Sequence, residues 1–92
     1  MTNAPIPSLP RGVRRHFDQL RGVSVLLGPE RVIMLDDIGC AILDEVDGIS
    51  HVRTISETLA SRYGAPKDAV LADVVEFLTD LADKKLLDFG HG

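Results

Sequence analysis

Cysteine, aromatic side chains and long apolar runs are all scarce in this chain of 92 residues. A single cysteine, Cys40, excludes an internal disulfide and is typical of a protein in a reducing compartment, so we expect a cytoplasmic location. No apolar run approaches the roughly 18–20 residues that a membrane-spanning helix needs, so we expect no membrane partner. A chain of this length forms one small domain and has little room for a deep active site.

The sequence also lacks the groupings of residues that carry catalysis or hold a metal. The three histidines lie far apart, and none has a cysteine or a carboxylate at a recognised ligand spacing. Cys40 has no histidine three or four residues away, although a nucleophile needs a base within reach. Adjacent carboxylates at 36–37 and 44–45 are explained as a helix cap and a polar helix side, which leaves a catalytic pair without support. We therefore expect a protein that is not an enzyme and has no metal or cofactor.

The net charge of −4 is distributed unevenly along the chain. Residues 1–35 carry five bases and two acids, a formal charge of +3, whereas residues 36–92 carry five bases and twelve acids, a formal charge of −7. The first third can attract an acidic partner, but the remainder repels the phosphates of nucleic acid. We expect no nucleic-acid partner.

The stretch 31–48 is the most informative part of the chain, because a strand pattern changes into a helix pattern at one polar junction. The apolar run 32–35 predicts a strand, Asp36 is placed to cap a helix, and apolar residues then recur at helical spacing as far as Val46. The same reading predicts two earlier strands and two later helices, at 13–20, 23–27, 52–63 and 66–85.

A proline-rich segment precedes these elements. Residues 1–10 hold three of the five prolines and no apolar stretch, so we expect a mobile arm there and no signal peptide. Residues 11–92 then form a single domain. Three N-terminal strands followed by three helices predict a small α+β domain of winged helix-turn-helix type, to which residues 86–89 can add a short last strand.

The third expected helix is apolar over more than one stripe. Leu71, Val74 and Leu78 share one face, while Val70, Phe77 and Leu81 widen it beyond what a single packing face needs. The pattern favours a helix packed on both sides and leaves open a helix that lines a binding groove.

Several short segments occur in a characteristic order. They are Arg11-Gly-Val13, Phe17-Asp-Gln-Leu-Arg-Gly22, Val25-Leu-Leu-Gly-Pro-Glu30, Leu35-Asp36, Ala41-Ile-Leu43, Val46-Asp-Gly48, Ile55, Leu59, Tyr63-Gly64, Asp73-Val74, Phe77-Leu78 and Leu81. Together they resemble the PqqD family of pyrroloquinoline quinone (PQQ) biosynthesis, over about residues 8–88. No single segment suffices, but the Arg-Gly, Leu-Leu-x-Pro-Glu and Asp-Gly pieces are fairly specific in combination.

The resemblance implies a function that composition does not. Proteins of this family bind a ribosomally made precursor peptide of PqqA type and present it to a PqqE-like radical-SAM enzyme, which cross-links a Glu and a Tyr of the peptide. The peptide lies as an added strand beside the third strand and against the third helix. The resemblance thus implies a peptide-binding site at Arg31, Val32, Ile33, Met34, Leu35, Val70, Val74, Phe77 and Leu81.

The chain departs from the family pattern at three positions. Asp36 replaces an Asn, His51 stands where a Ser or Thr opens the second helix, and Lys85 replaces a Gly before the last Leu. The second change weakens a helix cap and the third strains a left-handed residue. One alternative function is recognition of a different modified peptide. A second is DNA binding by a winged helix, but the acidic third helix argues against it. We expect a monomer. Exposed strand edges and the N-terminal arm also allow a dimer.

Overall fold

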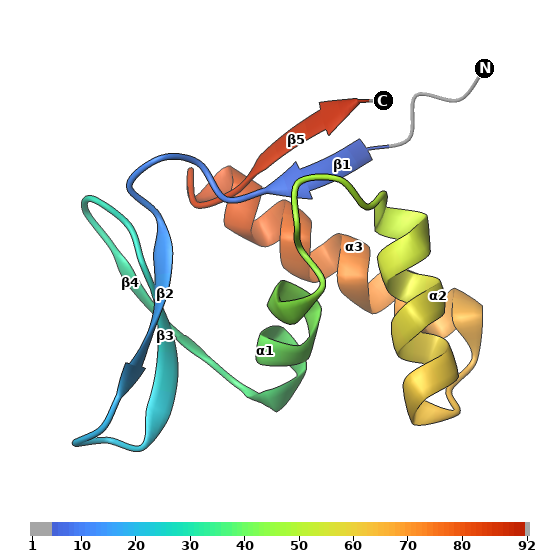
Figure 1. Cartoon of the computed structure of the whole chain (residues 1–92), viewed down its shortest axis with the longest axis horizontal. Helices are drawn as coiled ribbons and strands as arrows, with labels where there is room; N and C mark the ends of the chain where they lie inside the picture. The colour runs from blue at the N-terminus through green and yellow to red at the C-terminus, as the bar shows by residue number, and fades with distance from the viewer. Residues whose placement is uncertain (1–4, 92) are drawn as a thin grey trace.

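The computed structural model describes residues 5–91, and over that range it contains two small sheets and three helices (Figure 1). The elements in chain order are β1 (Pro5–Ser8), β2 (Arg14–Asp18), β3 (Val23–Leu27), β4 (Val32–Leu35), α1 (Asp37–Asp44), α2 (Val52–Tyr63), α3 (Lys67–Asp83) and β5 (Asp88–His91). The predicted α+β class is confirmed, and the three predicted strands and three predicted helices are all present.

The larger sheet is antiparallel and has the order β2-β3-β4. Leu26 at its centre is fully buried and pairs with Ile33 of β4, so these two residues lie on the face that packs on the helices. The β2–β3 turn is closed by Asp18, whose Oδ1 accepts from the N–H groups of Leu20 and Arg21 at 3.0 and 3.2 Å. Within the part of the chain that the structure describes, no strand pairs with the second edge of β4.

The smaller sheet pairs β1 with β5 and corrects the expectation of a mobile arm over residues 1–10. Residues 5–8 lie antiparallel to 88–91, and Pro7 is fully buried, so this part of the arm belongs to the folded domain. Residues 1–4 lie outside the described range. Alternate residues of a strand point their N–H groups to the same edge, so Pro5 and Pro7 remove donors from one edge only and leave the other for β5.

One hydrophobic core joins the large sheet to the helices. Its fully buried members come from β3, every helix and the segment after α3; they include Leu26, Ile42, Ile55, Val74, Leu78, Leu81 and Leu86. The single buried polar side chain among the described residues is Ser56, whose hydroxyl donates to the carbonyl of Val52 at 2.9 Å. In Figure 1, α1 lies between the β2–β4 sheet and α2, and α3 passes behind α1.

The start of α1 follows the sequence prediction. Asp36 is its N-cap, and Oδ1 of Asp36 accepts from the N–H of Gly39 at 2.7 Å. The helix ends at Asp44, two residues before the predicted end. The N–H groups of Glu45 and Val46 bond the carbonyls of Ile42 and Leu43 at 3.0 and 3.1 Å, which tightens and closes the last turn.

The other two helices begin without a side-chain cap. His51 at the N-cap of α2 makes no capping hydrogen bond, as its departure from the family pattern predicts. The neighbouring hydroxyl of Ser50 does not replace it, because it donates to Asp47 at 3.1 Å. Pro66 is the N-cap residue of α3 rather than its first helical residue, so that helix begins one position later than predicted.

Candidate peptide-binding groove

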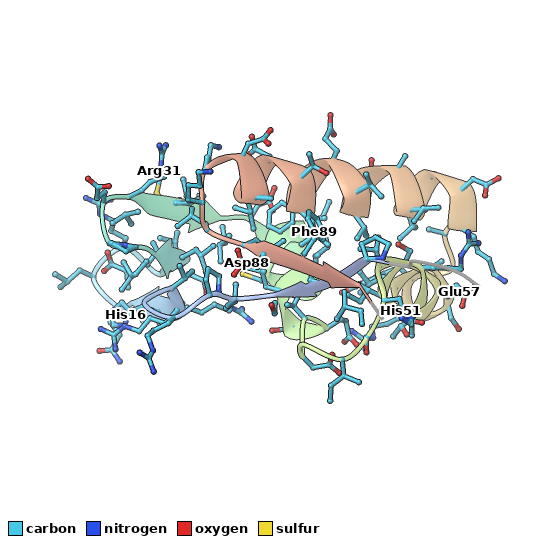
Figure 2. The ribbon with its side chains drawn as sticks, turned by 90° about the horizontal axis from the view of Figure 1, so that it is seen from above. His16, Arg31, His51, Glu57, Asp88 and Phe89 are labelled. Atoms are coloured by element: carbon cyan, nitrogen blue, oxygen red, sulfur yellow. The ribbon has the colours of Figure 1, made fainter. Side chains whose placement is uncertain are left out.

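The open edge of β4, the start of α1 and one side of α3 border the same region of the molecule. Figure 2 shows Arg31, at the start of β4, on the same side as α3 and near its C-terminal end, whereas His16 of β2 lies on the opposite side. β4 therefore starts on the α3 side of the larger sheet, near the C-terminal end of that helix, and its second edge is unpaired among the described residues.

Close backbone approaches fix the position of α3 along this region. Leu86, just after α3, packs so tightly on the β3–β4 turn that a methyl group at Gly28 would overlap its Cδ2. The ring of Phe77 lies against the first turn of α1, where a methyl group at Gly39 would be 3.1 Å from Cε1. A side chain at either glycine would push the opposing ring or methyl group away, so both glycines allow α3 and the residues after it to pack closely here.

A cavity of about 330 Å³ lies at the N-terminal end of α3, where that helix meets α1 and the end of α2. Its lining is almost wholly apolar, and the charged residues in it are Asp37 and Asp73. The lining residues are Asp37, Ile38, Ala41, Ile42, Leu59, Tyr63, Ala65, Val70, Asp73 and Val74. Two of the nine residues expected at the peptide site, Val70 and Val74, therefore belong to a real depression.

The nine expected site residues differ in their accessibility. Those with exposed side chains are Arg31, Val32 and Met34; those half-buried are Ile33, Val70 and Phe77; those buried are Leu35, Val74 and Leu81. Leu81 is fully buried in the core, so it supports the groove from beneath and offers no surface of its own. Of the four expected site residues on α3, the half-buried Val70 and Phe77 are the accessible ones.

Val32 and Met34 lie on the face of the sheet that points away from the helices. They alternate with Ile33 and Leu35, which pack on the core, and their side chains are 62% and 64% exposed. Of the segment 31–35, only the side chains of Ile33 and Leu35 therefore point toward the helices. Its backbone edge is available along its whole length, which is what an added strand requires.

Sequence reasoning missed residues of α1 and α2 that border the cavity. Ile38 and Tyr63 match the apolar spacing of their helices, yet they are 65% and 63% exposed. Periodicity identifies a helix face but not how far a neighbour covers it, and both residues lie at helix ends where coverage stops. Asp37 belongs to the adjacent carboxylates at 36–37 and Asp73 to one of the segments that carry the family resemblance, but neither position by itself indicates a binding site.

The charges around the groove separate along its length. Arg31 lies at the end near the C-terminus of α3, and Asp37 and Asp73 lie at the cavity end. Two ion pairs connect the C-terminal end of α1 to its neighbours. Arg15 of β2 pairs with Asp44, and Arg62 of α2 pairs with Glu45 at 3.0 Å. The hydrogen bond from Arg15 to Asp44 raises the pKa of the Arg15 guanidinium.

Residues 5–91 contain no cluster of three or more potential metal ligands. Cys40 is a half-buried thiol on α1. In the same range, no helix is both long and apolar enough to cross a membrane. Three helices packed on a three-stranded antiparallel sheet with an open edge form a winged-helix-like fold, and such an edge can bind an extended peptide as an added strand, as peptide-recognition domains do.

The chain belongs to the PqqD family. The family profile described as Coenzyme PQQ synthesis protein D (PqqD) matches residues 24–87. The "PqqA binding protein" of Bradyrhizobium diazoefficiens is 41% identical over 87 residues, which cover 95% of this chain and 84% of that protein. The "Bifunctional coenzyme PQQ synthesis protein C/D" of Methylorubrum extorquens is also 41% identical over 87 residues, but these cover only 23% of that longer protein.

Two solved structures share the fold. One is the solution structure of the PqqD part of Methylobacterium extorquens PqqCD, described as a functional, stand-alone recognition element for a ribosomally synthesised and modified peptide. It has a TM-score of 0.77 and 44% identity, and the match covers 89% of this chain and 87% of that one. The other is the crystal structure of PqqD from Xanthomonas campestris, with a TM-score of 0.62, 40% identity, and coverage of 88% and 90%.

Proposed function

We propose that this protein binds the PqqA-type precursor peptide of PQQ biosynthesis as a strand added to the open edge of β4. The observation that carries the proposal is the unpaired edge of β4, which leads into the first turn of α1 where the half-buried ring of Phe77 of α3 packs. A strand edge supplies backbone hydrogen bonds that are indifferent to sequence. Side-chain contacts on a neighbouring helix then supply selectivity.

The names of the relatives support the identity of this ligand. Relatives that span nearly the whole chain are called PqqA binding proteins, and the similar solution structure is described as a peptide recognition element. Both descriptions agree with a site that has backbone donors and an apolar wall, and residues 5–91 hold no cluster of three or more potential metal ligands. Binding without chemistry is what this site supports.

The bound peptide then has to reach an enzyme. The fused C/D protein of M. extorquens shows that a domain of this family can be covalently joined to another protein of the same pathway. We propose that this chain acts as a peptide chaperone that holds the precursor for a PqqE-like radical-SAM enzyme, which forms the Glu–Tyr cross-link. The enzyme carries out the chemistry, and this chain supplies binding and orientation.

The test is peptide affinity measured by isothermal titration calorimetry for a groove variant and a matched control. Phe77→Ala removes the ring that lies between α3 and α1, and we expect peptide affinity to fall by about 5- to 150-fold, the equivalent of about 1–3 kcal/mol. Val75→Ala is the control. Val75 lies on the same helix and is 44% exposed, but it faces β1 and β5 beside Pro5 and Phe89.

Thermal stability measured on the same samples separates binding from folding, because Phe77 also touches the core. We expect Val75→Ala to leave affinity within about twofold of the unmodified protein. Equal losses of affinity in two variants that are both folded at the assay temperature would contradict the groove.

A further inference from the structure

We infer that the cavity between α1, α2 and α3 receives one bulky apolar side chain of the bound peptide, and that Asp37 and Asp73 hold a basic residue next to it. This inference rests on the proposed function, because it names what part of the peptide enters a depression at the end of the groove. The peptide would thus carry an apolar residue next to a basic one. Backbone pairing with a strand edge cannot by itself select such a sequence.

The size of the cavity fits a single large side chain. Its volume of about 330 Å³ is at the lower end of the roughly 300–1,000 Å³ that ligand pockets span, so it is large enough for one bulky side chain. Apart from the two aspartates and the Tyr63 hydroxyl, its lining side chains are hydrocarbon, which favours an aliphatic or aromatic occupant.

The walls leave large apolar groups in contact with water. Ile38 and Tyr63 project from the ends of α1 and α2, each with more than half of its side chain exposed, and both line the cavity. Adjacent exposed apolar side chains around a depression mark a binding surface more often than chance placement does. An apolar residue inserted between Ile38 and Tyr63 would bury parts of both side chains together.

The two carboxylates of the lining favour a positive charge in the ligand. Asp37 and Asp73 come from different helices and are both exposed. In the described part of the chain, neither takes part in an ion pair, although four other acids do. Since the protein supplies no cation here, a lysine or arginine of the peptide next to the apolar residue has complementary charge.

The cavity lies within reach of a peptide that follows the β4 edge. Leu35 ends β4, Asp36 caps α1, and Asp37 and Ile38 begin that helix and line the cavity. At about 3.3 Å per residue, a peptide strand that continues past Leu35 reaches the cavity roughly two to four residues further on. The anchoring side chain therefore belongs just beyond the segment of the peptide that pairs with β4.

The experiment combines an alanine scan of a synthetic PqqA-type precursor peptide with a variant whose cavity is filled. Ala41→Leu adds a larger side chain to the cavity wall from within α1, at a half-buried position, and leaves the β4 edge and Phe77 unchanged. With the unmodified protein, we expect replacement of one apolar peptide residue by alanine to lower the peptide's affinity at least tenfold. With Ala41→Leu, the same replacement should cost less than twofold.

The charge is tested in the same way. Asp73→Asn should abolish the effect of replacing the peptide's neighbouring basic residue, while leaving the effect of the apolar residue intact. If Ala41→Leu fails to fold, Ala65→Leu fills the same cavity from the α2–α3 turn. In addition, nuclear Overhauser contacts between the peptide and the Ile38 methyl groups would show directly that the peptide occupies the cavity of the unmodified protein.

The outcomes separate this inference from the proposed function. If the peptide binds but its alanine-scan profile is the same for the filled and unmodified proteins, the cavity inference is wrong and β4-edge binding stands. If the filled variant instead changes the oligomeric state of the free protein, the cavity is occupied by a second copy and the inference is equally wrong. If the unmodified protein binds no peptide, both the inference and the proposed function fail.

Discussion

Lys85 is held in a left-handed conformation that lysine disfavours, and replacing it should stabilise the protein. Its φ is +64°, and no other residue except glycine has a positive φ in the described range. The N–H of Leu86 bonds the carbonyl of Leu81 at 2.9 Å, and the N–H of Lys85 bonds that of Ala82 at 3.0 Å. These two bonds form the Schellman motif that ends α3, in which the left-handed position is usually glycine.

The expected gain follows from two opposing terms. The left-handed conformation costs a residue with a Cβ about 1–2 kcal/mol. Glycine avoids this cost but loses about 0.5–1 kcal/mol more backbone entropy on folding than a residue with a side chain. The difference gives Lys85→Gly about 0.5–1 kcal/mol of added stability, which corresponds to about 2–8 °C in Tm for a domain of this size.

The assay is thermal unfolding followed by circular dichroism, with two controls. Lys85→Ala removes the exposed side chain but keeps the Cβ, so its Tm should stay close to that of the unmodified protein. Gly64→Ala makes the opposite change at the end of α2, where φ is +63° and a methyl group would meet nothing within 4 Å. Gly64→Ala should lower Tm. If it does so while Lys85→Gly leaves Tm unchanged or lowers it, the reasoning is refuted.

Two further predictions concern the α1–α2 connection. His51→Ser should supply the missing N-cap of α2 and raise the free energy of unfolding by about 1 kcal/mol, measured by urea denaturation; no gain would show that the uncapped N–H groups are satisfied otherwise. The N–H groups of Ser50 and Ile49 donate to the carboxylate of Asp47 and lower its pKa. A lowered pKa stabilises the folded state above the unfolded-state value of about 3.9 and ceases to do so as the pH falls through the lower, folded-state value. The stability difference between the unmodified protein and Asp47→Ala should therefore be constant near neutral pH and shrink in acid; a difference that grows in acid would contradict the assignment.

Local rules predicted the parts of the fold whose cause lies within a few residues. Asp36 was identified as the cap of α1 because its side chain needs only the N–H groups of the next turn. The uncapped start of α2 at His51 followed from the same rule. The strain at Lys85 was likewise predictable, because the family pattern places a glycine there.

Non-local pairing was not predictable in the same way. β1 forms because β5, more than eighty residues away in sequence, offers it an edge, and the prolines at 5 and 7 hid this from a local reading. The apolar stripe of α3 was wider than one face, but periodicity cannot tell the buried Val74 and Leu81 from the accessible Val70 and Phe77. That distinction depends on where α1 and the β3–β4 turn stop covering the helix.

The central claim is that a precursor peptide binds along β4 and α3. The most direct test is an NMR titration of the isotope-labelled protein with a synthetic PqqA-type precursor peptide, following every backbone amide. We predict the largest chemical-shift changes in residues 31–35 and 70–81, with much smaller changes in β2, on the far side of the larger sheet. If the largest changes fell instead in residues 55–60 of α2, the groove assignment would be contradicted even if the peptide bound.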